Sequence, residues 1–414
     1  MLNLRRPSRF TTLVLVGAFG AVAGLLRAAA PQLTGSLTTV EGVRVLKLWG
    51  TPYERGYAHG FLLGNDILAL IESTLLDPRT LKDPTLYETG VRKTVLPRMQ
   101  FRPDHEQELQ GMLAGIQATL GPEKTRLNRL GRDLAVDDLK AVNTLADWNE
   151  FFCSSFSAWG DFQSDGELIT GRNLDFFTLP GLTEHHVVIA YLQPGEGRKR
   201  WISIAWPSLI GAYTAMNEEG VTINIHDVRV PSVPAATFIA PRTLALRDAI
   251  ETAAASTAVD DVMKVLEHSP VMCGNNIHVS APYTGQATPA AVLEWDSDRS
   301  RDGGTTLRVA AQEDGAKLRQ AVLCTNHHRI RQKPVACDRF EKLDRRLKAL
   351  AQDGRKIDTK TSQAILKLVA VPGTLQSVVF LPNRRELYLS LATAEQNAAK
   401  VRPVRLRLEE LFKK

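Results

Sequence analysis

Apolar residues follow two different spacings along the chain, and the change comes near residue 153. Residues 43–48 alternate between apolar and polar side chains, which is typical of a β-strand. Directly after them, Thr51, Pro52 and Glu54 have the order of an N-cap, a first helical residue and a reciprocal capping partner. Residues 53–150 then keep helix-like spacing. The pattern predicts one strand followed by a mostly helical segment.

Beyond residue 153, short β-type runs alternate with helical stretches at 240–267 and 337–351. The β-type runs lie at 168–170, 186–192, 201–205, 221–225, 277–280, 291–295, 321–325, 377–381 and 386–391. The chain shows neither an internal repeat nor a low-complexity linker. This pattern predicts an α+β fold, with antiparallel sheets between helical layers, in one compact unit.

Residues 1–30 have the pattern of an export signal. A start rich in Arg precedes an apolar stretch at 11–26 and the small residues Ala28 to Ala30. The stretch is shorter than the roughly 20 residues of a membrane span, which favours a cleaved signal. Arg27 and Pro31 are unfavourable for signal peptidase, so an uncleaved membrane anchor is the alternative. We expect an exported protein, periplasmic or secreted, that associates with the membrane if this segment is retained.

The formal charge of +6 does not indicate a nucleic-acid partner. Four of the arginines lie in the first 30 residues, which hold no acidic residue, and no basic stripe with interleaved aromatic residues follows. Four cysteines are too few for a disulfide framework, and they form no C-x-x-C pair. We therefore expect no metal, no cofactor and no nucleic acid.

The chemistry is concentrated in one predicted hairpin. The segment Cys153-Ser-Ser-Phe-Ser-Ala-Trp-Gly-Asp has the pattern of a strand, residues 164–166 form a turn, and Gly171-Arg-Asn-Leu-Asp-Phe176 returns. The return brings Arg172 and Asp175 beside Cys153. A nucleophilic cysteine needs a nearby cation to stabilise its thiolate, and Arg172 is the candidate.

This hairpin resembles that of the acyl-coenzyme A:6-aminopenicillanic acid acyltransferase family (peptidase family C45) and, more distantly, those of acid ceramidase, N-acylethanolamine amidases and bile-salt hydrolases. In these proteins a C-[ST]-S-type start is followed by a G-R-N-x-D-[FW] return. The similarity extends over most of residues 43–392. Its other elements are Gly50-Thr-Pro-Tyr-Glu-Arg-Gly56, Met216-Asn-Glu-Glu-Gly-Val221, Cys324-Thr-Asn-His327 and Gln376-Ser-Val-Val379.

The resemblance implies a four-layer αββα sandwich of the N-terminal-nucleophile (Ntn) hydrolase class. Self-cleavage of the Phe152–Cys153 peptide would divide the chain into residues 31–152 and a core at 153–414, which stay associated. The implied roles are a nucleophile at Cys153, flanking groups at Arg172 and Asp175, an oxyanion donor at Asn326, and site-lining residues at Asn224 and Arg339.

Two departures from the family pattern bear on function. Phe152 precedes the nucleophile where relatives often have a small residue, and Ile225 stands where the ceramidase-like branch has a glutamate. The second departure argues against a ceramidase.

Each site residue also has a structural alternative. Cys153 is, by composition alone, a buried apolar residue, Arg172 and Asp175 an ion pair at a sheet edge, Asn326 a turn residue, and Arg339 part of a solvated helix face.

The predicted activity is hydrolysis of a small-molecule N-acyl amide through an acyl-enzyme on Cys153. Transfer of the acyl group to an amine uses the same intermediate and is the alternative. Hydrolysis is favoured because acyl-coenzyme A is scarce outside the cytoplasm. A non-catalytic envelope binding protein that retains the fold is the alternative from another class.

Overall fold

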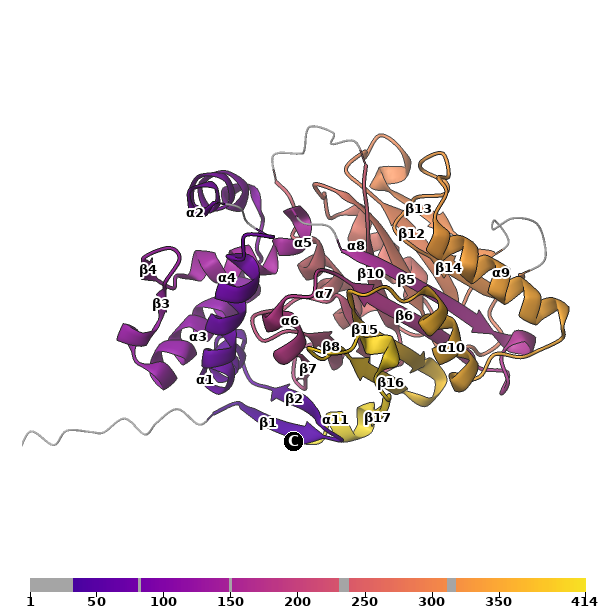
Figure 1. The fold of residues 1–414 in the computed structure, drawn as a ribbon, viewed down its shortest axis with the longest axis horizontal. Coiled ribbons are helices and arrows are strands. Elements are labelled where there is room, and N and C mark those ends of the chain that lie inside the picture. The colour runs from indigo at the N-terminus through magenta and orange to yellow at the C-terminus, as the bar shows by residue number, and fades with distance from the viewer. Residues whose placement is uncertain (1–32, 81–82, 149–150, 231–237, 311–317) are drawn as a thin grey trace, which may run out of the picture. The chain divides into compact units, whose positions relative to one another are not determined.

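Two β-sheets lie at the centre of the fold (Figure 1). The computed structural model describes residues 33–80, 83–148, 151–230, 238–310 and 318–414. Residues Leu33–Lys414 form one compact unit. The nine-stranded sheet has the order β1-β2-β7-β8-β9-β10-β11-β12-β13, and the six-stranded sheet has the order β14-β5-β6-β15-β16-β17.

The strands of the larger sheet are β1 (Gly35–Val40), β2 (Val43–Leu48), β7 (Val187–Tyr191), β8 (Trp201–Ala205), β9 (Thr214–Asn217), β10 (Thr222–Val228), β11 (Gly274–Ser280), β12 (Ala290–Trp295) and β13 (Thr305–Arg308). Those of the smaller sheet are β14 (Ala321–Cys324), β5 (Phe152–Trp159), β6 (Leu168–Asp175), β15 (Thr374–Leu381), β16 (Glu386–Leu391) and β17 (Val404–Arg407). Neighbouring strands are antiparallel except β2 and β7, which are parallel. A short hairpin, β3 (Arg126–Leu127) and β4 (Arg132–Asp133), stands apart.

The sheets face each other, and helices cover both outer faces. Contacts of β10 with β5 and of β12 with β14 join the two sheets. The helices α7 (Arg242–Thr252) and α8 (Ala258–Glu267) pack on the larger sheet, while α9 (Asp338–Gln352) and α10 (Thr359–Val369) pack on the smaller one (Figure 1). Strands covered on both faces have few exposed positions, and every residue of β6 is buried. The predicted αββα architecture is confirmed.

The segment before β5 is mostly helical, with α1 (Pro52–Leu70), α3 (Pro103–Leu120) and α4 (Val136–Asn143) as its main helices. The shorter elements are α2 (Pro84–Leu86), α5 (Leu145–Trp148), the π-helical turns at Ile71–Leu75 and Tyr87–Val95, and the 3₁₀ turns at Leu96–Arg98 and Pro122–Lys124. The predicted capping box is present: the amide of Thr51 donates to Oε2 of Glu54 at 2.8 Å, and the amide of Glu54 donates to Oγ1 of Thr51 at 3.3 Å.

Glycines let α1 and α3 approach until their backbones touch. A Cβ placed at Gly56 would stand 1.8 Å from the carbonyl oxygen of Glu108, and one at Gly60 would stand 2.0 Å from that of Met112. Both positions therefore require glycine. This contact explains Gly56 of the N-terminal motif.

The structure differs from the sequence-based elements in several places, and strands β1, β9, β13 and β17 were not predicted. The helical stretch at 240–267 is two helices, α7 and α8, and helix α10 was not anticipated. Strands β1 and β2 extend the larger sheet, so the segment before residue 153 is part of the sandwich.

The proposed signal or anchor at residues 1–30 lies outside the described residues. Within the described ranges, no helix is both long enough and apolar enough to span a bilayer.

Candidate active site

Strands β5 and β6 place the site residues by their register. Cys153 lies opposite Leu174, Ser155 opposite Arg172, and Phe152 opposite Asp175. Opposed residues share a face of the sheet, and successive residues alternate between faces. Cys153 and Arg172 therefore point between the two sheets, where Ser155 contacts the larger sheet. The side chain of Asp175 leaves the strand on the opposite face of the sheet.

Arg172 lowers and Asp175 raises the pKa of the Cys153 thiol, although the two residues leave β6 on opposite faces. The Nε of Arg172 donates to Oγ1 of Thr214 at 2.8 Å, and Oδ1 of Asp175 accepts from Oγ1 of Thr374 at 2.6 Å. No ion pair joins Arg172 to Asp175 among the described residues. The alternative of a sheet-edge ion pair is wrong, because both residues are buried and separately bonded.

Asn326 holds the backbone on both sides of residue 152. Its Oδ1 accepts from the amide of Cys153 at 2.7 Å, and its Nδ2 donates to the carbonyl oxygen of Phe151 at 2.9 Å. The same Nδ2 donates to the carbonyl oxygen of Asp227 at 2.7 Å. The carboxamide is buried, and its oxygen and both of its N–H groups are hydrogen-bonded. Asn326 is therefore not a solvated turn residue.

Arg339, in the first turn of α9, converges on the same point. Its guanidinium donates to the carbonyl oxygen of Cys153, to Oδ1 of Asn326 at 2.8 Å and to Oδ2 of Asp175 at 3.3 Å. Its side chain is 14% exposed, whereas that of Arg345 on the same helix is 68% exposed. The alternative of a solvated helix face therefore fails for Arg339 and describes Arg345.

Burial dominates the electrostatics of the thiol. It raises the pKa of Cys153 to about 11, and the Asp175 and Asp227 carboxylates act in the same direction, while Arg172 and Arg339 oppose them. Burial also raises the pKa of Asp175 to about 6, against the hydrogen bond from Thr374 and the charge of Arg339. In the uncleaved chain the thiol is thus protonated at neutral pH and Asp175 is ionised.

Arg172 and Asn224 present polar atoms to the space between the sheets. Asn224 lies directly opposite Thr214, the residue that binds Arg172. The two terminal nitrogens of Arg172 and both carboxamide atoms of Asn224 are buried, and they have no hydrogen-bond partner in the part of the chain that the structure describes. A buried guanidinium without a bonded carboxylate favours a negative charge on the neighbouring sulfur.

A buried hydrogen-bonded network, absent from the sequence analysis, connects the sheets beside this site. Oγ of Ser155 contacts Nε2 of His226 at 2.8 Å and Nδ1 of His278 at 2.7 Å, and Nε2 of His278 contacts Oγ of Ser157 at 2.9 Å. Burial lowers the pKa of both imidazoles, that of His278 to about 3, so they stay neutral. His226 is thus bonded to a residue of the other sheet, 71 positions away.

A small apolar cavity of about 30 Å³ adjoins the site. Phe151, Phe176 and Tyr213 line it, and they neighbour Cys153, Asp175 and Thr214 within two positions along the chain. The opposite wall comes from the helical segment and the loop after β8, with Leu70, Leu145 and Trp206. The rings of Phe151 and Phe176 stack with centroids 4.3 Å apart.

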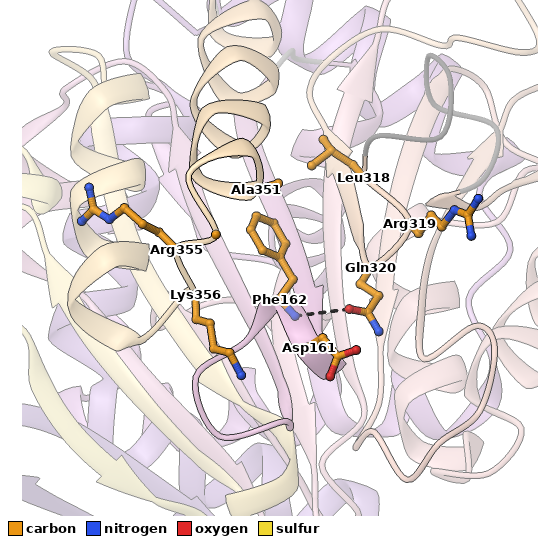
Figure 2. Close-up of a pocket in the computed structure, with 9 residues that line it drawn as sticks. Asp161, Phe162, Leu318, Arg319, Gln320, Ala351, Arg355 and Lys356 are labelled. Carbon is orange, nitrogen blue, oxygen red and sulfur yellow. Dashed lines mark hydrogen bonds between the residues drawn. The ribbon is translucent and has the colours of Figure 1, made fainter.

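A second pocket lies beyond the other end of β5 (Figure 2). Arg319, Arg355 and Lys356 line it, but Figure 2 shows their charged ends pointing away from one another, with the ring of Phe162 between them. Diverging cations do not form an anion site, and we assign no function to this pocket.

A family model, "Acyl-coenzyme A:6-aminopenicillanic acid acyl-transferase", matches residues 162–396. The chain belongs to this acyl-transferase family. The match covers more than half of the chain and confirms the resemblance seen in the sequence. It includes Arg172, Asp175, Asn224, Asn326 and Arg339, and it begins nine residues after the candidate nucleophile.

Individual relatives of this acyl-transferase family member are distant. An uncharacterized protein of Archaeoglobus fulgidus is 24% identical over 211 residues, which is 48% of this chain and 34% of that protein. The chain thus spans about a third of the length of this curated relative.

Solved structures with detectable similarity have low TM-scores. An N-acylethanolamine-hydrolyzing acid amidase ortholog of Caenorhabditis elegans gives 0.42 at 17% identity, covering 56% of this chain and 93% of that one. A conjugated bile acid hydrolase of Clostridium perfringens gives 0.43 at 12%, covering 63% and 94%. Penicillin V acylase of Agrobacterium tumefaciens gives 0.39 at 14%, covering 59% and 89%. Likeness at this level does not bear on activity.

All four cysteines of this family member are free in the structure, including the three outside the site. Cys337 is half-buried, and hydrogen bonding from His327 and neighbouring groups lowers its pKa to about 7. Its Sγ lies 3.7 Å from Oγ1 of Thr325, beside the oxyanion candidate Asn326.

Proposed function

We propose that this protein is a self-cleaving amide hydrolase of the Ntn class, with Cys153 as its nucleophile. The single observation that carries the proposal is a pair of hydrogen bonds at Asn326: its Oδ1 accepts from the amide of Cys153, and its Nδ2 donates to the carbonyl of Phe151. They bind the nitrogen of the peptide to be cut and the carbonyl of the residue before Phe152. Arg339 binds the carbonyl of Cys153, so the backbone is held on both sides of Phe152.

Self-cleavage would proceed by an N-to-S acyl shift. The Sγ of Cys153 attacks the carbonyl carbon of Phe152, the C–N bond breaks, and the departing nitrogen takes the thiol proton. Water then adds to the thioester, the C–S bond breaks, and the products are a carboxylate at Phe152 and a thiol on a residue with a free amine. Arg172 stabilises negative charge on the sulfur during the attack.

Turnover would use the liberated amine as the base. An α-amine has a pKa of about 8, so near neutral pH it can accept the proton of its own thiol. The thiolate attacks the substrate carbonyl, the leaving amine takes that proton, and water hydrolyses the resulting acyl-enzyme. Nδ2 of Asn326 can bind the oxyanion once the Phe151 carbonyl leaves it after cleavage. A preorganised donor of this kind supplies about 3 kcal/mol.

The acyl group would occupy the apolar cavity beside the nucleophile. Its volume of about 30 Å³ is below the range of small-molecule sites, so the lining side chains must move apart to admit an acyl chain. The walls are aromatic and aliphatic apart from the hydroxyls of Thr74, Ser208 and Tyr213. We infer an N-acyl amide whose acyl part is apolar and whose amine part faces the opening.

Acyl transfer to an amine is the second candidate, and the family match favours it. The two reactions share the acyl-enzyme and differ only in the acceptor. Hydrolysis follows if residues 1–30 export the protein, as we also propose, because acyl-coenzyme A is scarce outside the cytoplasm.

The test is turnover of a panel of labelled N-acyl amides with acyl chains of increasing length, with and without a competing amine. We expect free acid as the product, a thioester on Cys153 detected by mass, and neither from Cys153→Ala. Preferential formation of the new amide at low amine concentration would establish the transferase. A folded protein in which Cys153 resists a thiol-reactive electrophile and turns over nothing would favour the non-catalytic binding protein.

A further inference from the structure

Asp227, near the end of β10, accepts from Asn326 through its backbone carbonyl, but its carboxylate has a further contact that no step above uses. Its carboxylate oxygen Oδ2 accepts the amide hydrogen of Phe151, and Oδ1 pairs with the Arg242 guanidinium at 2.9 Å. The side chain is 6% exposed. A buried carboxylate that binds one backbone amide so close to the cleavage point indicates a role in placing that backbone.

Phe151 is held at three points. Its amide is bound by Asp227, its carbonyl oxygen by Nδ2 of Asn326 at 2.9 Å, and its ring packs against Phe176 and Tyr213 with centroids 4.3 and 5.6 Å away. The following Phe152 side chain is 48% exposed. The orientation of the Phe152 carbonyl therefore depends on how firmly its neighbours are fixed.

Asp227 is itself oriented from two sides. Its backbone carbonyl accepts from Nδ2 of Asn326 at 2.7 Å. The Arg242 guanidinium that pairs with its carboxylate also donates to Oδ1 of Asn275, the residue directly opposite Asp227 on β11. Asp227 and Asn326 thus form one unit that binds both the amide and the carbonyl of Phe151.

We propose that Asp227 is a positioning residue for self-cleavage. By fixing Phe151 it directs the Phe152 carbonyl carbon toward the thiol of Cys153. An attack of this kind requires reacting atoms about 3–3.5 Å apart, and a displacement of about 1 Å can cost 10²-fold in rate. This inference rests on the self-cleavage proposed above. This role ends when the peptide breaks, because Asp227 binds Phe151, which then belongs to the other chain from Cys153.

The experiment measures self-cleavage and turnover separately in the full chain. Newly made chain from cell-free synthesis is followed on a denaturing gel, and the cleaved protein is assayed with an N-acyl amide per titrated thiol. Asp227→Asn keeps an oxygen acceptor at the same place. Asp227→Leu combined with Arg242→Met removes the acceptor and both charges, which avoids leaving a buried charge unpaired.

We expect the Asn variant to cleave within about threefold of the wild-type rate and the double variant to be slowed by at least about tenfold. Once cleaved, the double variant should lose far less of kcat than of its cleavage rate, because only cleavage depends on the bond to Phe151. A double variant that cleaves at the wild-type rate, or one that loses cleavage and kcat equally, would overturn the assignment.

A third variant keeps the proposal testable if the double variant does not fold. Asp227→Glu retains the charge but displaces the acceptor by one methylene, so it should cleave more slowly than Asp227→Asn. The reverse order would contradict a positioning role. A wild-type chain that never cleaves would instead refute self-cleavage itself, which distinguishes the two failures.

Discussion

At the residue scale, the uncleaved site combines a protonated thiol with an ionised carboxylate. Burial raises the pKa of Cys153 to about 11 and that of Asp175 to about 6. The ionised Asp175 binds Arg339 at 3.3 Å, and Arg339 in turn binds Asn326 at 2.8 Å. The charge on Asp175 therefore helps, through Arg339, to hold Asn326 in its hydrogen bonds to the backbone around Phe152.

Self-cleavage should depend on pH through Asp175. The carboxylate that holds Arg339 is present above pH 6 and is lost as the pH falls through about 6. We expect the rate to fall about tenfold between pH 7 and pH 5, and Asp175→Asn to cleave slowly with this dependence removed. A time course of newly synthesised chain in buffers from pH 5 to pH 8 measures both. An Asp175→Asn variant whose cleavage rate still falls at acid pH would contradict this role.

At the element scale, the helical segment is anchored by the contact between α1 and α3. Gly60 is required because a Cβ there would meet the carbonyl oxygen of Met112 at 2.0 Å. At Gly64, one turn further along α1, the nearest atom to such a Cβ is the Thr119 methyl group at 3.0 Å. A side-chain methyl group therefore fits better at Gly64 than at Gly60.

Gly60→Ala should destabilise the fold by about 1–3 kcal/mol, because the helices must separate to admit the methyl group. Gly64→Ala is the matched control, and it should be neutral or gain up to about 1 kcal/mol of helix propensity. Urea unfolding of both, in the Cys153→Ala background so that one chain unfolds, gives the free energies. Equal destabilisation by the two changes would show that the close approach of α3 at Gly60 does not determine the cost.

At the scale of the whole molecule, the segments on the two sides of the cleavage point share a sheet and a buried set of charges. Strand β2 pairs with β7 across the cleavage point in sequence. Glu108 of α3 binds Arg247 of α7 at 2.8 Å, and both side chains are almost fully buried. We therefore propose that the two chains stay associated after cleavage.

The two chains should co-elute in size-exclusion chromatography and separate only in denaturant. Arg247→Leu leaves Glu108 and Glu251 without this partner, which should weaken the assembly by about 3–5 kcal/mol and lower the urea midpoint of dissociation. Arg384→Leu removes a surface pair with Asp165 and should change little. Equal midpoints for the two variants would argue that Arg247 does not hold the chains together.

The sequence predicts local structure well, but it predicts poorly which residues distant along the chain meet at the site. The Cys153 hairpin, the capping box at Thr51 and most strands follow from periodicity, because each depends on neighbours along the chain. Arg339 and Asn326 were assigned by resemblance, and their meeting with Cys153 depends on packing of α9 across the smaller sheet. Asp227 was missed because its partner Phe151 is 76 positions away, and a single aspartate ending a strand carries no pattern.

The central claim is that Cys153 becomes an N-terminal residue, and N-terminal sequencing with intact mass of the purified protein tests it most directly. We predict two chains, one ending at Phe152 and one beginning at Cys153, and a single uncut chain from Cys153→Ala. A wild-type protein that is active as one uncut chain, or a break at any other peptide, would contradict the account.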